Sequence, residues 1–268
     1  MDFAVQFWGV RGKVATPGKD TVRYGGNTAC LEMRVGNQRL VFDSGTGVRK
    51  LGNSLLSQMP VEIHLFFTHC HWDRIQGFPF LVPAFIPGNR FHIYGVRTTN
   101  GASFEELLEQ QMTPPNFPVP IQVMQSEIKF YNLSLDKKQC LGDVYVETVA
   151  LNHVNSSVGY RINWQEWSVV YATDIGYYSA ELSPRLLDIV NGVDLLILDA
   201  PKFLQGKEDV SIQSLLKLIE TSRAKRVVIS SYNPEHDDDF LERLEKKLQN
   251  IFPHTSLARE GMVVELTS

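Results

Sequence analysis

Three residues that commonly bind transition metals lie at alternate positions in one short segment: His69, His71 and Asp73, directly after the apolar run 63–67. In an extended turn, this spacing can bring two imidazole rings and a carboxylate into one small volume. Imidazole nitrogens together with carboxylate oxygens suit zinc, manganese or iron better than calcium. The segment therefore predicts a transition-metal site, with ordinary loop histidines as the alternative. Cys70 is as consistent with a small buried filler as with a ligand.

The apolar run before His69 is one of four that end abruptly in polar residues. Each run is typical of a strand buried on both faces of a sheet. The runs are 63–67, 168–172, 195–198 and 227–229, and they lead into Thr68-His69, Thr173-Asp174, Asp199 and Ser230-Ser231. Side chains at such strand ends are held by a rigid core yet face solvent, and α/β folds place ligands there. We therefore expect one site at a sheet edge, with His153 nearby; the alternative is that polar residues merely end the strands.

The first part of the chain has further strand patterns, and helical patterns come later. Strands are predicted at 4–8, 29–35 and 39–42, with a hairpin turn at 36–38 and glycine-bearing loops at 24–28 and 43–47. Helices are predicted after the capping-box spacing of Ser103 and Glu106, after Ser211, and from the acidic run 237–239 to Ile251. Segment 113–121 carries four prolines, so it is expected to be an extended loop and a candidate lip over the site.

The bulk composition limits the classes of function. The chain has 268 residues, of which 43% are hydrophobic, and no linker divides it, so we expect a single domain spanning 1–268. The net charge of -4, with no basic run longer than two residues, argues against a long nucleic acid as a partner. A small anionic ligand stays compatible, because a few buried cations or a metal can hold one phosphate.

The sequence gives no sign of export or membrane insertion. It opens with an acidic residue and no basic region, and no apolar stretch approaches the roughly 18 residues that span a bilayer. Cys30, Cys70 and Cys140 are odd in number and far apart, which fits reduced thiols better than a disulfide framework. These features predict a cytoplasmic protein with no membrane contact.

The segment around His69 also resembles a known signature. Thr68-His69-Cys70-His71-Trp72-Asp73-Arg74, followed by Gly77, is similar to the THxHxDHxxG motif of the metallo-β-lactamase superfamily. More narrowly, segments 8–12, 24–28, 43–47, 151–153, 172–174 and 233–238 resemble, in that order, segments of a bacterial branch related to ribonuclease Z and to cyclic-nucleotide phosphodiesterases. The resemblance covers nearly the whole chain. It implies an α/β fold, the αββα four-layer sandwich with two facing sheets and helices outside, and a homodimer.

The resemblance also implies roles for the ligand-type residues. His69, His71 and His153 would hold a first metal ion, and Asp174 would bridge to a second. Asp73 would belong to the second metal and act as a catalytic residue by helping to position the nucleophilic water. Two cations can lower the pKa of such a water toward neutrality and stabilise the charge that develops on phosphoryl oxygens.

Three departures from the family pattern affect the second metal and the proton donor. Arg74 stands where the family has a metal-binding His, and a guanidinium has no lone pair to offer a metal. Ser231 replaces another metal-binding His, and a neutral hydroxyl is a far weaker ligand. Segment 206–211 lacks the His that assists the leaving group in the family. We therefore expect one divalent metal (zinc, manganese or iron) and an empty second site.

Several residues near this signature have two interpretations. Arg74 would form an ion pair with Asp73 or would bind a phosphate bidentately. Asp199 and His236 are candidate substrate-side groups, although a strand-end Asp and a solvated His before a helix are equally good interpretations. Three other histidines show no partner pattern and are expected to be ordinary strand or loop residues: His64, His92 and His254.

Two functions are compatible with these patterns. The first is a phosphodiesterase-like metallo-hydrolase of a small phosphodiester or cyclic nucleotide, mononuclear or attenuated. The alternative is a catalytically inactive pseudoenzyme that acts as a ligand-binding or protein-interaction module, with a pocket remodelled by Arg74 and Ser231. Hydrolysis of β-lactams or thioesters fits less well, because the narrower resemblance is to phosphodiesterases. Processing of tRNA would call for an additional basic arm, which the sequence lacks.

Overall fold

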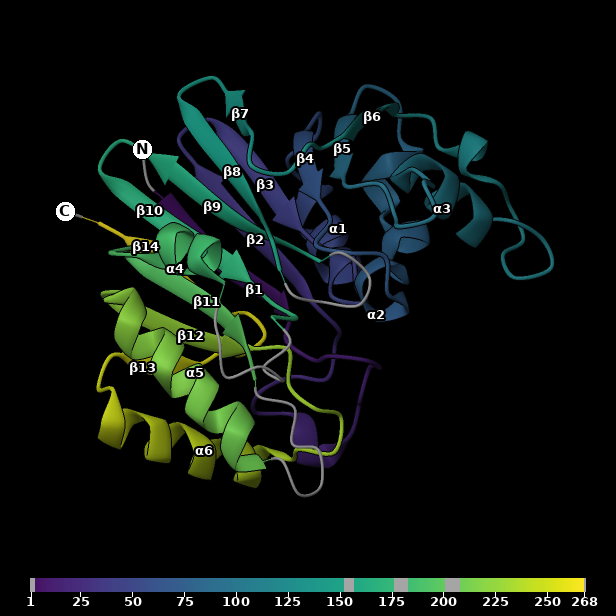
Figure 1. Ribbon diagram of the computed structural model, residues 1–268. Coiled ribbons are helices and arrows are strands. Elements are labelled where there is room, and N and C mark those ends of the chain that lie inside the picture. The colour runs from purple at the N-terminus through teal and green to yellow at the C-terminus, as the bar shows by residue number, and fades with distance from the viewer. Residues whose placement is uncertain (1–2, 152–156, 176–182, 201–207, 268) are drawn as a thin grey trace.

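Two β-sheets pack face to face and carry helices on both outer sides (Figure 1). The computed structural model describes residues 3–151, 157–175, 183–200 and 208–267. The strand order is β14-β1-β2-β3-β4-β5-β6 in the first sheet and β13-β12-β11-β10-β9-β8-β7 in the second.

The bounds of the elements are as follows. The first sheet contains β1 (Phe3–Gly9), β2 (Cys30–Val35), β3 (Gln38–Phe42), β4 (Glu62–Phe66), β5 (Arg90–Gly95), β6 (Glu127–Asn132) and β14 (Val263–Leu266). The second contains β7 (Lys138–Leu141), β8 (Val144–Ala150), β9 (Val158–Trp164), β10 (Trp167–Ala172), β11 (Leu195–Asp199), β12 (Arg226–Ser230) and β13 (Thr255–Leu257). The helices are α1 (Val48–Leu55), α2 (Trp72–Ile75), α3 (Phe104–Gln111), α4 (Pro184–Val190), α5 (Glu208–Ser222) and α6 (Asp238–Ile251).

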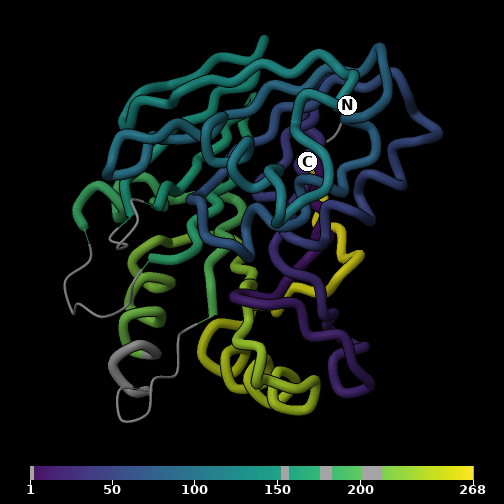
Figure 2. The backbone as a smooth tube through the Cα atoms, turned by 90° about the vertical axis from the view of Figure 1, so that its right-hand side faces the viewer, coloured from purple at the N-terminus to yellow at the C-terminus, as the bar shows by residue number. Residues whose placement is uncertain are grey.

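Alternating side chains of the strands build two apolar cores. Phe42 and Phe66 belong to the core between the sheets, which extends to α4, α5 and α6. Their neighbours Val41 and Leu65 point the opposite way, into the core beneath α1 and α3. Figure 2 shows α5 and α6 at the opposite end of the molecule from the chain between residues 60 and 130. The arrangement is the αββα sandwich expected from the resemblance, and that expectation is confirmed.

Most predicted elements are present, with small shifts of their ends. Ser103 and Glu106 form a reciprocal capping box at α3, and the side chain of Asp237 caps α6. The hairpin turn is shorter than predicted, because Gln38 already belongs to β3. Helix α5 begins at Glu208 rather than after Ser211. Among the described residues, no helix is long and apolar enough to cross a bilayer.

The loops that carry the candidate site leave the sheets where parallel strands end. Strands β3, β4 and β5 run parallel, as do β10, β11 and β12. The loops after β3, β10 and β12 each hold a polar residue in the left-handed region: Asp43 (φ 60°), Asp174 (φ 62°) and Ser231 (φ 55°). Residues other than glycine rarely adopt this conformation, and it recurs at functional sites. The chain therefore turns sharply at strand ends of both sheets.

Candidate metal centre

A cavity of about 210 Å³ lies where these strand ends meet. It is lined by residues from both sheets and from the loop after β1: Gly12, Lys13, His71, Asp73, Arg74, Asp174, Asp199, Ala200, Ser231, Tyr232 and Asn233. Six of the residues singled out in the sequence thus line one cavity. None of the described residues in 113–121 lines it, so the structure gives that segment no role as a lip over the cavity.

The two histidines of the signature contact each other at this cavity. His69 Nε2 and His71 Nδ1 are 2.9 Å apart, and their rings stand nearly perpendicular, at 84°. The hydroxyl of Thr68 lies 3.0 Å from His69 Nδ1 and donates to Asp43 Oδ1 at 2.9 Å. These contacts fix the orientation of the His69 ring and direct its Nε2 toward His71. In metal sites, a hydrogen bond to the nitrogen that does not bind the metal orients the histidine ring in the same way.

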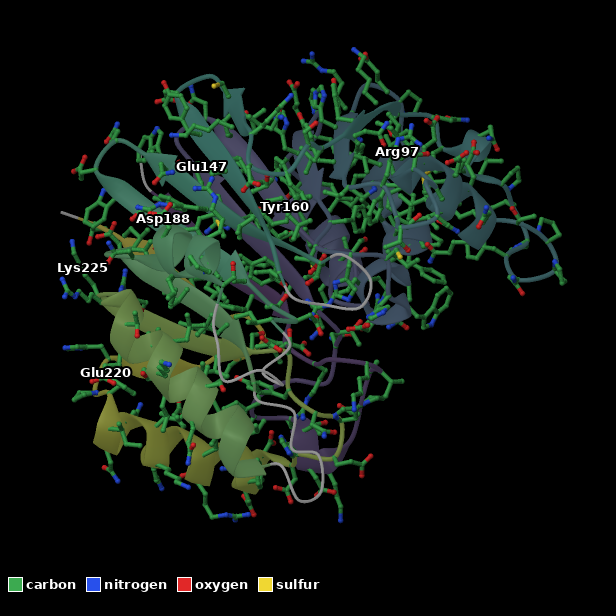
Figure 3. The ribbon with its side chains drawn as sticks, viewed as in Figure 1. Arg97, Glu147, Tyr160, Asp188, Glu220 and Lys225 are labelled. Atoms are coloured by element: carbon green, nitrogen blue, oxygen red, sulfur yellow. The ribbon has the colours of Figure 1, made fainter. Side chains whose placement is uncertain are left out.

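The strand end that carries His69 is also tied to the second sheet. Tyr160, which comes from β9 and is labelled in Figure 3, donates a 2.5 Å hydrogen bond to the carbonyl of Phe67. The amide of Val158 donates to the carbonyl of Thr68 at 2.9 Å. These contacts between the two sheets therefore fix the backbone immediately before His69.

The described residues fit one divalent cation. Donor atoms of His69, His71 and Asp73 all lie within 4.8 Å of one another. Nitrogen ligands sit about 2.0–2.1 Å from zinc, so two of them are roughly 3.3 Å apart. The two ring nitrogens are only slightly closer than that, and a cation can take the place of the proton that they share. Asp174 Oδ2 is 3.8 Å from His69 Nε2. The predicted ligand His153 lies outside the described residues.

Arg74 occupies the centre of the site and is almost completely buried, with 1% of its surface exposed. Its Nη1 donates to Asp43 Oδ2 and to the hydroxyl of Tyr171, both at 3.0 Å. Its Nη2 donates to Asp174 Oδ2 at 2.7 Å and to Ser231 Oγ at 3.1 Å. These partners follow or belong to β3, β10 and β12, so one guanidinium joins strand ends of both sheets.

The ion pair between Arg74 and Asp73 is also present, with Nε 3.3 Å from Oδ2. Although burial opposes the charge of Arg74, the nearby Tyr171 and the carboxylates of Asp174, Asp43 and Asp73 raise its pKa well above the ordinary value. Burial raises the pKa of the Asp43 carboxyl, and the Arg74 guanidinium opposes that rise. The site therefore contains a permanent cation.

A second metal does not fit the residues around Arg74. The guanidinium already contacts Asp174 and Asp73, two carboxylates that a second ion would need, and it also uses the Ser231 hydroxyl. Arginine has no lone pair to offer, and its charge repels an adjacent cation. Arg74 Nη2 and His69 Nε2 both approach Oδ2 of Asp174, at 2.7 Å and 3.8 Å, so this carboxylate lies between the guanidinium and a single ion at the histidine pair.

The charge balance around the cavity also favours one added cation. Among the described residues, Asp73, Asp174 and Asp199 line the cavity and Asp43 lies behind Arg74, whereas the cations are Arg74 and Lys13. The carboxyl groups therefore outnumber the cations among these residues, and a divalent cation would offset that excess. Buried charges are costly when they are not compensated.

The other two candidate residues differ in position. Asp199 lies at the end of β11, is buried and lines the cavity. His236 is buried beside α6, where its ring stacks on Phe240 with centroids 4.0 Å apart, and it does not line the cavity. Burial and the charge of Arg11 lower the pKa of His236 to about 4. The structure thus groups Asp199 with the site and places His236 behind it.

Sequence reasoning missed three members of the site. The sequence around Asp43 did indicate a functional loop, because a glycine-rich segment follows a predicted strand there, but that pattern did not identify Asp43 as a partner of Arg74. No sequence pattern indicated Tyr171, which is an ordinary residue of β10, or Lys13, which lies in the loop after β1. A larger surface hollow, of about 480 Å³, lies elsewhere; Glu147 and Asp188, labelled in Figure 3, line it, and no histidine is among its described lining residues.

Comparison with known proteins identifies the family. The sequence model of the β-lactamase superfamily domain matches residues 38–230. The chain belongs to the metallo-β-lactamase superfamily. Among its members, two ribonucleases Z are similar to this chain. The protein of Haloarcula marismortui is 26% identical over 165 residues, which are 61% of this chain and 48% of that protein. The protein of Thermococcus kodakarensis is 26% identical over 139 residues, or 50% of this chain and 40% of that protein.

The matched region spans less than half of each of these relatives, but several solved structures match over nearly their whole length. The metallo-β-lactamase fold protein YhfI from Bacillus subtilis has a TM-score of 0.71 at 17% identity, covering 99% of both chains. A diphosphatase from the PhnP family has a TM-score of 0.72 at 16% identity, covering 99% of this chain and 98% of that one. The short form of human tRNase Z has a TM-score of 0.69 at 16% identity, covering 99% and 100%. At these identities the likeness establishes the fold alone.

Proposed function

We propose that this protein is a phosphodiesterase-like metallo-hydrolase that uses one divalent cation together with the fixed guanidinium of Arg74. The contact between Arg74 Nη2 and Asp174 Oδ2, at 2.7 Å, carries the proposal, because it puts a permanent positive charge beside the carboxylate that also approaches His69. His69, His71 and Asp174 would hold the cation, with His153 as a fourth ligand. The ion would be zinc, manganese or iron, as imidazole and carboxylate donors favour.

The residues of the cavity suit the transfer of a phosphoryl group to water. A bound divalent cation supplies a Lewis acid that polarises a phosphoryl oxygen and lowers the pKa of a water molecule. The Asp73 carboxylate lines the cavity and can accept a hydrogen bond from the attacking water, which orients it. Arg74 places positive charge where negative charge develops on the phosphoryl oxygens, and the exposed Lys13 can pair with the phosphate of the bound substrate.

The size and charge of the cavity favour a small substrate. Its volume of about 210 Å³ can hold a phosphodiester group and the atoms next to it, and is below the roughly 300–1,000 Å³ of sites that enclose a whole drug-sized ligand. The chain has a net charge of -4, so a long phosphate backbone would find little general attraction. We therefore propose a cyclic nucleotide or another small phosphodiester as substrate, rather than the RNA named for the ribonuclease Z relatives.

The test is to measure metal content and hydrolysis on the same samples. We expect the protein loaded with manganese, zinc or iron to hydrolyse bis(p-nitrophenyl) phosphate or a cyclic nucleotide. The variant His71→Ala should lose both the activity and one equivalent of metal, whereas His254→Gln, which changes an exposed histidine, should keep both. A protein that binds this metal and hydrolyses neither class of substrate would contradict the proposal.

A second candidate function, a pseudoenzyme that only binds a ligand or partner, is favoured by one observation. Ser231 and Arg74 bind each other at 3.1 Å, so the second metal position is rebuilt as a closed hydrogen-bonded unit. The double variant Arg74→His, Ser231→His would then gain hydrolysis that the parent lacks. Full activity in the parent would eliminate this candidate.

Three further properties are proposed from the sequence and the resemblance. Residues 1–268 would form one domain, the chain would form a homodimer, and the protein would work in the cytoplasm. Light scattering after size-exclusion chromatography tests the dimer directly, since a single peak at about the mass of one chain would exclude it.

A further inference from the structure

A second group of metal-binding side chains lies at the beginning of β4 and β5, away from the candidate centre. His64 and His92 are paired across these parallel strands, and Glu62 lies two positions before His64, on the same face. Donor atoms of the three residues all lie within 4.8 Å of one another. The sequence had indicated ordinary histidines here, because the partners are contributed by neighbouring strands.

The two rings are held by tyrosine hydroxyls. His64 Nδ1 lies 3.1 Å from the hydroxyl of Tyr94, and His92 Nδ1 lies 3.1 Å from that of Tyr131. Metal-binding histidines are commonly oriented in this way through the nitrogen that does not bind the metal. The Nε2 atom of each ring is left for another partner.

The Nε2 atoms face the carboxylate of Glu62. His92 Nε2 is 2.8 Å from Glu62 Oε1, and Arg90 Nη2 contacts the other carboxylate oxygen at 3.2 Å. Within the part of the chain that the structure describes, His64 Nε2 makes no hydrogen bond. Burial, with the nearby His92 as a second cause, lowers the pKa of His64 to about 4, so its ring is neutral at physiological pH.

We propose that Glu62, His64 and His92 form a second binding site for a divalent transition metal, separate from the candidate centre. Two imidazole nitrogens and one carboxylate are a ligand set that zinc and its neighbours in the periodic table accept, with solvent completing the coordination. The rings are now stacked, with centroids 4.7 Å apart and planes 13° apart. His92 is the more exposed of the two rings, so it is the one that adjusts its position when both Nε2 atoms bind one ion.

The site is distinct from the centre at His69, although β4 carries His64 and leads into the segment that carries His69. His64 lies five residues before His69, which corresponds to roughly 16 Å along an extended chain. A metal here would join β4 to β5 at the ends of these strands that lie away from the cavity. Neither the proposed hydrolysis nor the role of Arg74 depends on it.

The experiment is a calorimetric titration of the metal-free, full-length protein with zinc. We expect His92→Gln to bind one zinc fewer than the parent. We expect Glu62→Gln to lower the affinity for the same zinc ion at least about tenfold, a typical effect of disturbing a metal site. His254→Gln, the control, should match the parent. In a His71→Ala background, one zinc should stay bound until His92→Gln is added.

Two variants distinguish a metal site from a group of residues that only stabilises the fold. Tyr131→Phe removes only the hydroxyl behind His92, so it should weaken zinc binding while secondary structure by circular dichroism stays unchanged. Glu62→Gln changes a partly exposed side chain and should fold even if a histidine variant does not. Zinc binding by Glu62→Gln and His92→Gln that equals the parent's in number and affinity would overturn the proposal.

Discussion

Arg74 Nη2 and Asp174 Oδ2 form a 2.7 Å ion pair between residues 100 positions apart in the sequence. The arginine comes from α2, the short helix that follows β4 of the first sheet, and the aspartate follows β10 in the second. The pair therefore joins the two sheets at the edge where the histidines lie. Asp174 is shared between this fixed cation and the place where a single metal would bind.

Removal of the charge of Arg74 should destabilise the metal-free protein. Arg74→Met keeps much of the side-chain length but leaves Asp43 and Asp174 without their counter-charge. Loss of one partner of a buried ion pair typically costs about 3–5 kcal/mol. We expect the free energy of unfolding, measured by urea denaturation, to fall by about that amount. Arg243→Met, on the exposed face of α6, is the control and should change it by less than about 0.5 kcal/mol. A similarly small change in Arg74→Met would show that the ion pairs are not stabilising.

The hydroxyl of Tyr171 should contribute separately to the same network. It accepts a hydrogen bond from Arg74 and donates one to Asp43, both at 3.0 Å. Burial and the Asp43 carboxylate raise the pKa of Tyr171 well above its ordinary value, so the proton stays in place. We expect Tyr171→Phe to lower the free energy of unfolding by about 1–3 kcal/mol, as for other hydrogen bonds to charged groups.

A double-mutant cycle checks that this effect passes through Arg74. The loss in the double variant Tyr171→Phe, Arg74→Met should differ from the sum of the single losses by at least about 0.5 kcal/mol. Strict additivity would place Tyr171 outside the network. Tyr145→Phe, which removes an exposed hydroxyl, serves as the control.

Lys13 should contribute to substrate binding if the proposed activity is present. It lies on the exposed rim of the cavity, where its ammonium can pair with a phosphate. We expect Lys13→Ala to raise KM about fivefold and to leave kcat nearly unchanged, since an exposed ion pair contributes up to about 1 kcal/mol. The effect should decrease as salt is added. Lys19→Ala removes a lysine outside the cavity and should leave KM unchanged, whereas an equal effect in both variants would indicate a general influence of net charge.

Acid should destabilise the protein partly through His236. Its pKa is lowered from about 6.5 to about 4 in the folded state, so the unfolded chain binds more protons between these pH values. The free energy of unfolding should therefore fall as the pH drops below 6.5, by up to about 1.4 kcal/mol per pH unit from this residue. Urea denaturation at pH 7, 6 and 5 should show a smaller slope in His236→Gln. Equal slopes in the parent and the variant would assign the acid sensitivity to other groups.

The sequence alone was enough to predict the family, the layered αββα architecture and the ends of most strands. Short-range physics determines these features, because an apolar run that stops at a polar residue marks a buried strand and its end. The signature from Thr68 to Arg74 identified the histidines and the missing ligand in the same way. Even the pairing of Arg74 with Asp73 could be foreseen, since the two are neighbours in the chain.

Only the tertiary structure decided what Arg74 does. Its contacts with Asp43, Tyr171, Asp174 and Ser231 join loops separated by up to 157 positions, and no local pattern specifies such partners. The same holds for His64 and His92, which meet because two parallel strands align in one particular register. The residue types set which chemistry is available, but the distances between strands determine which charges compensate each other and therefore where a cation fits.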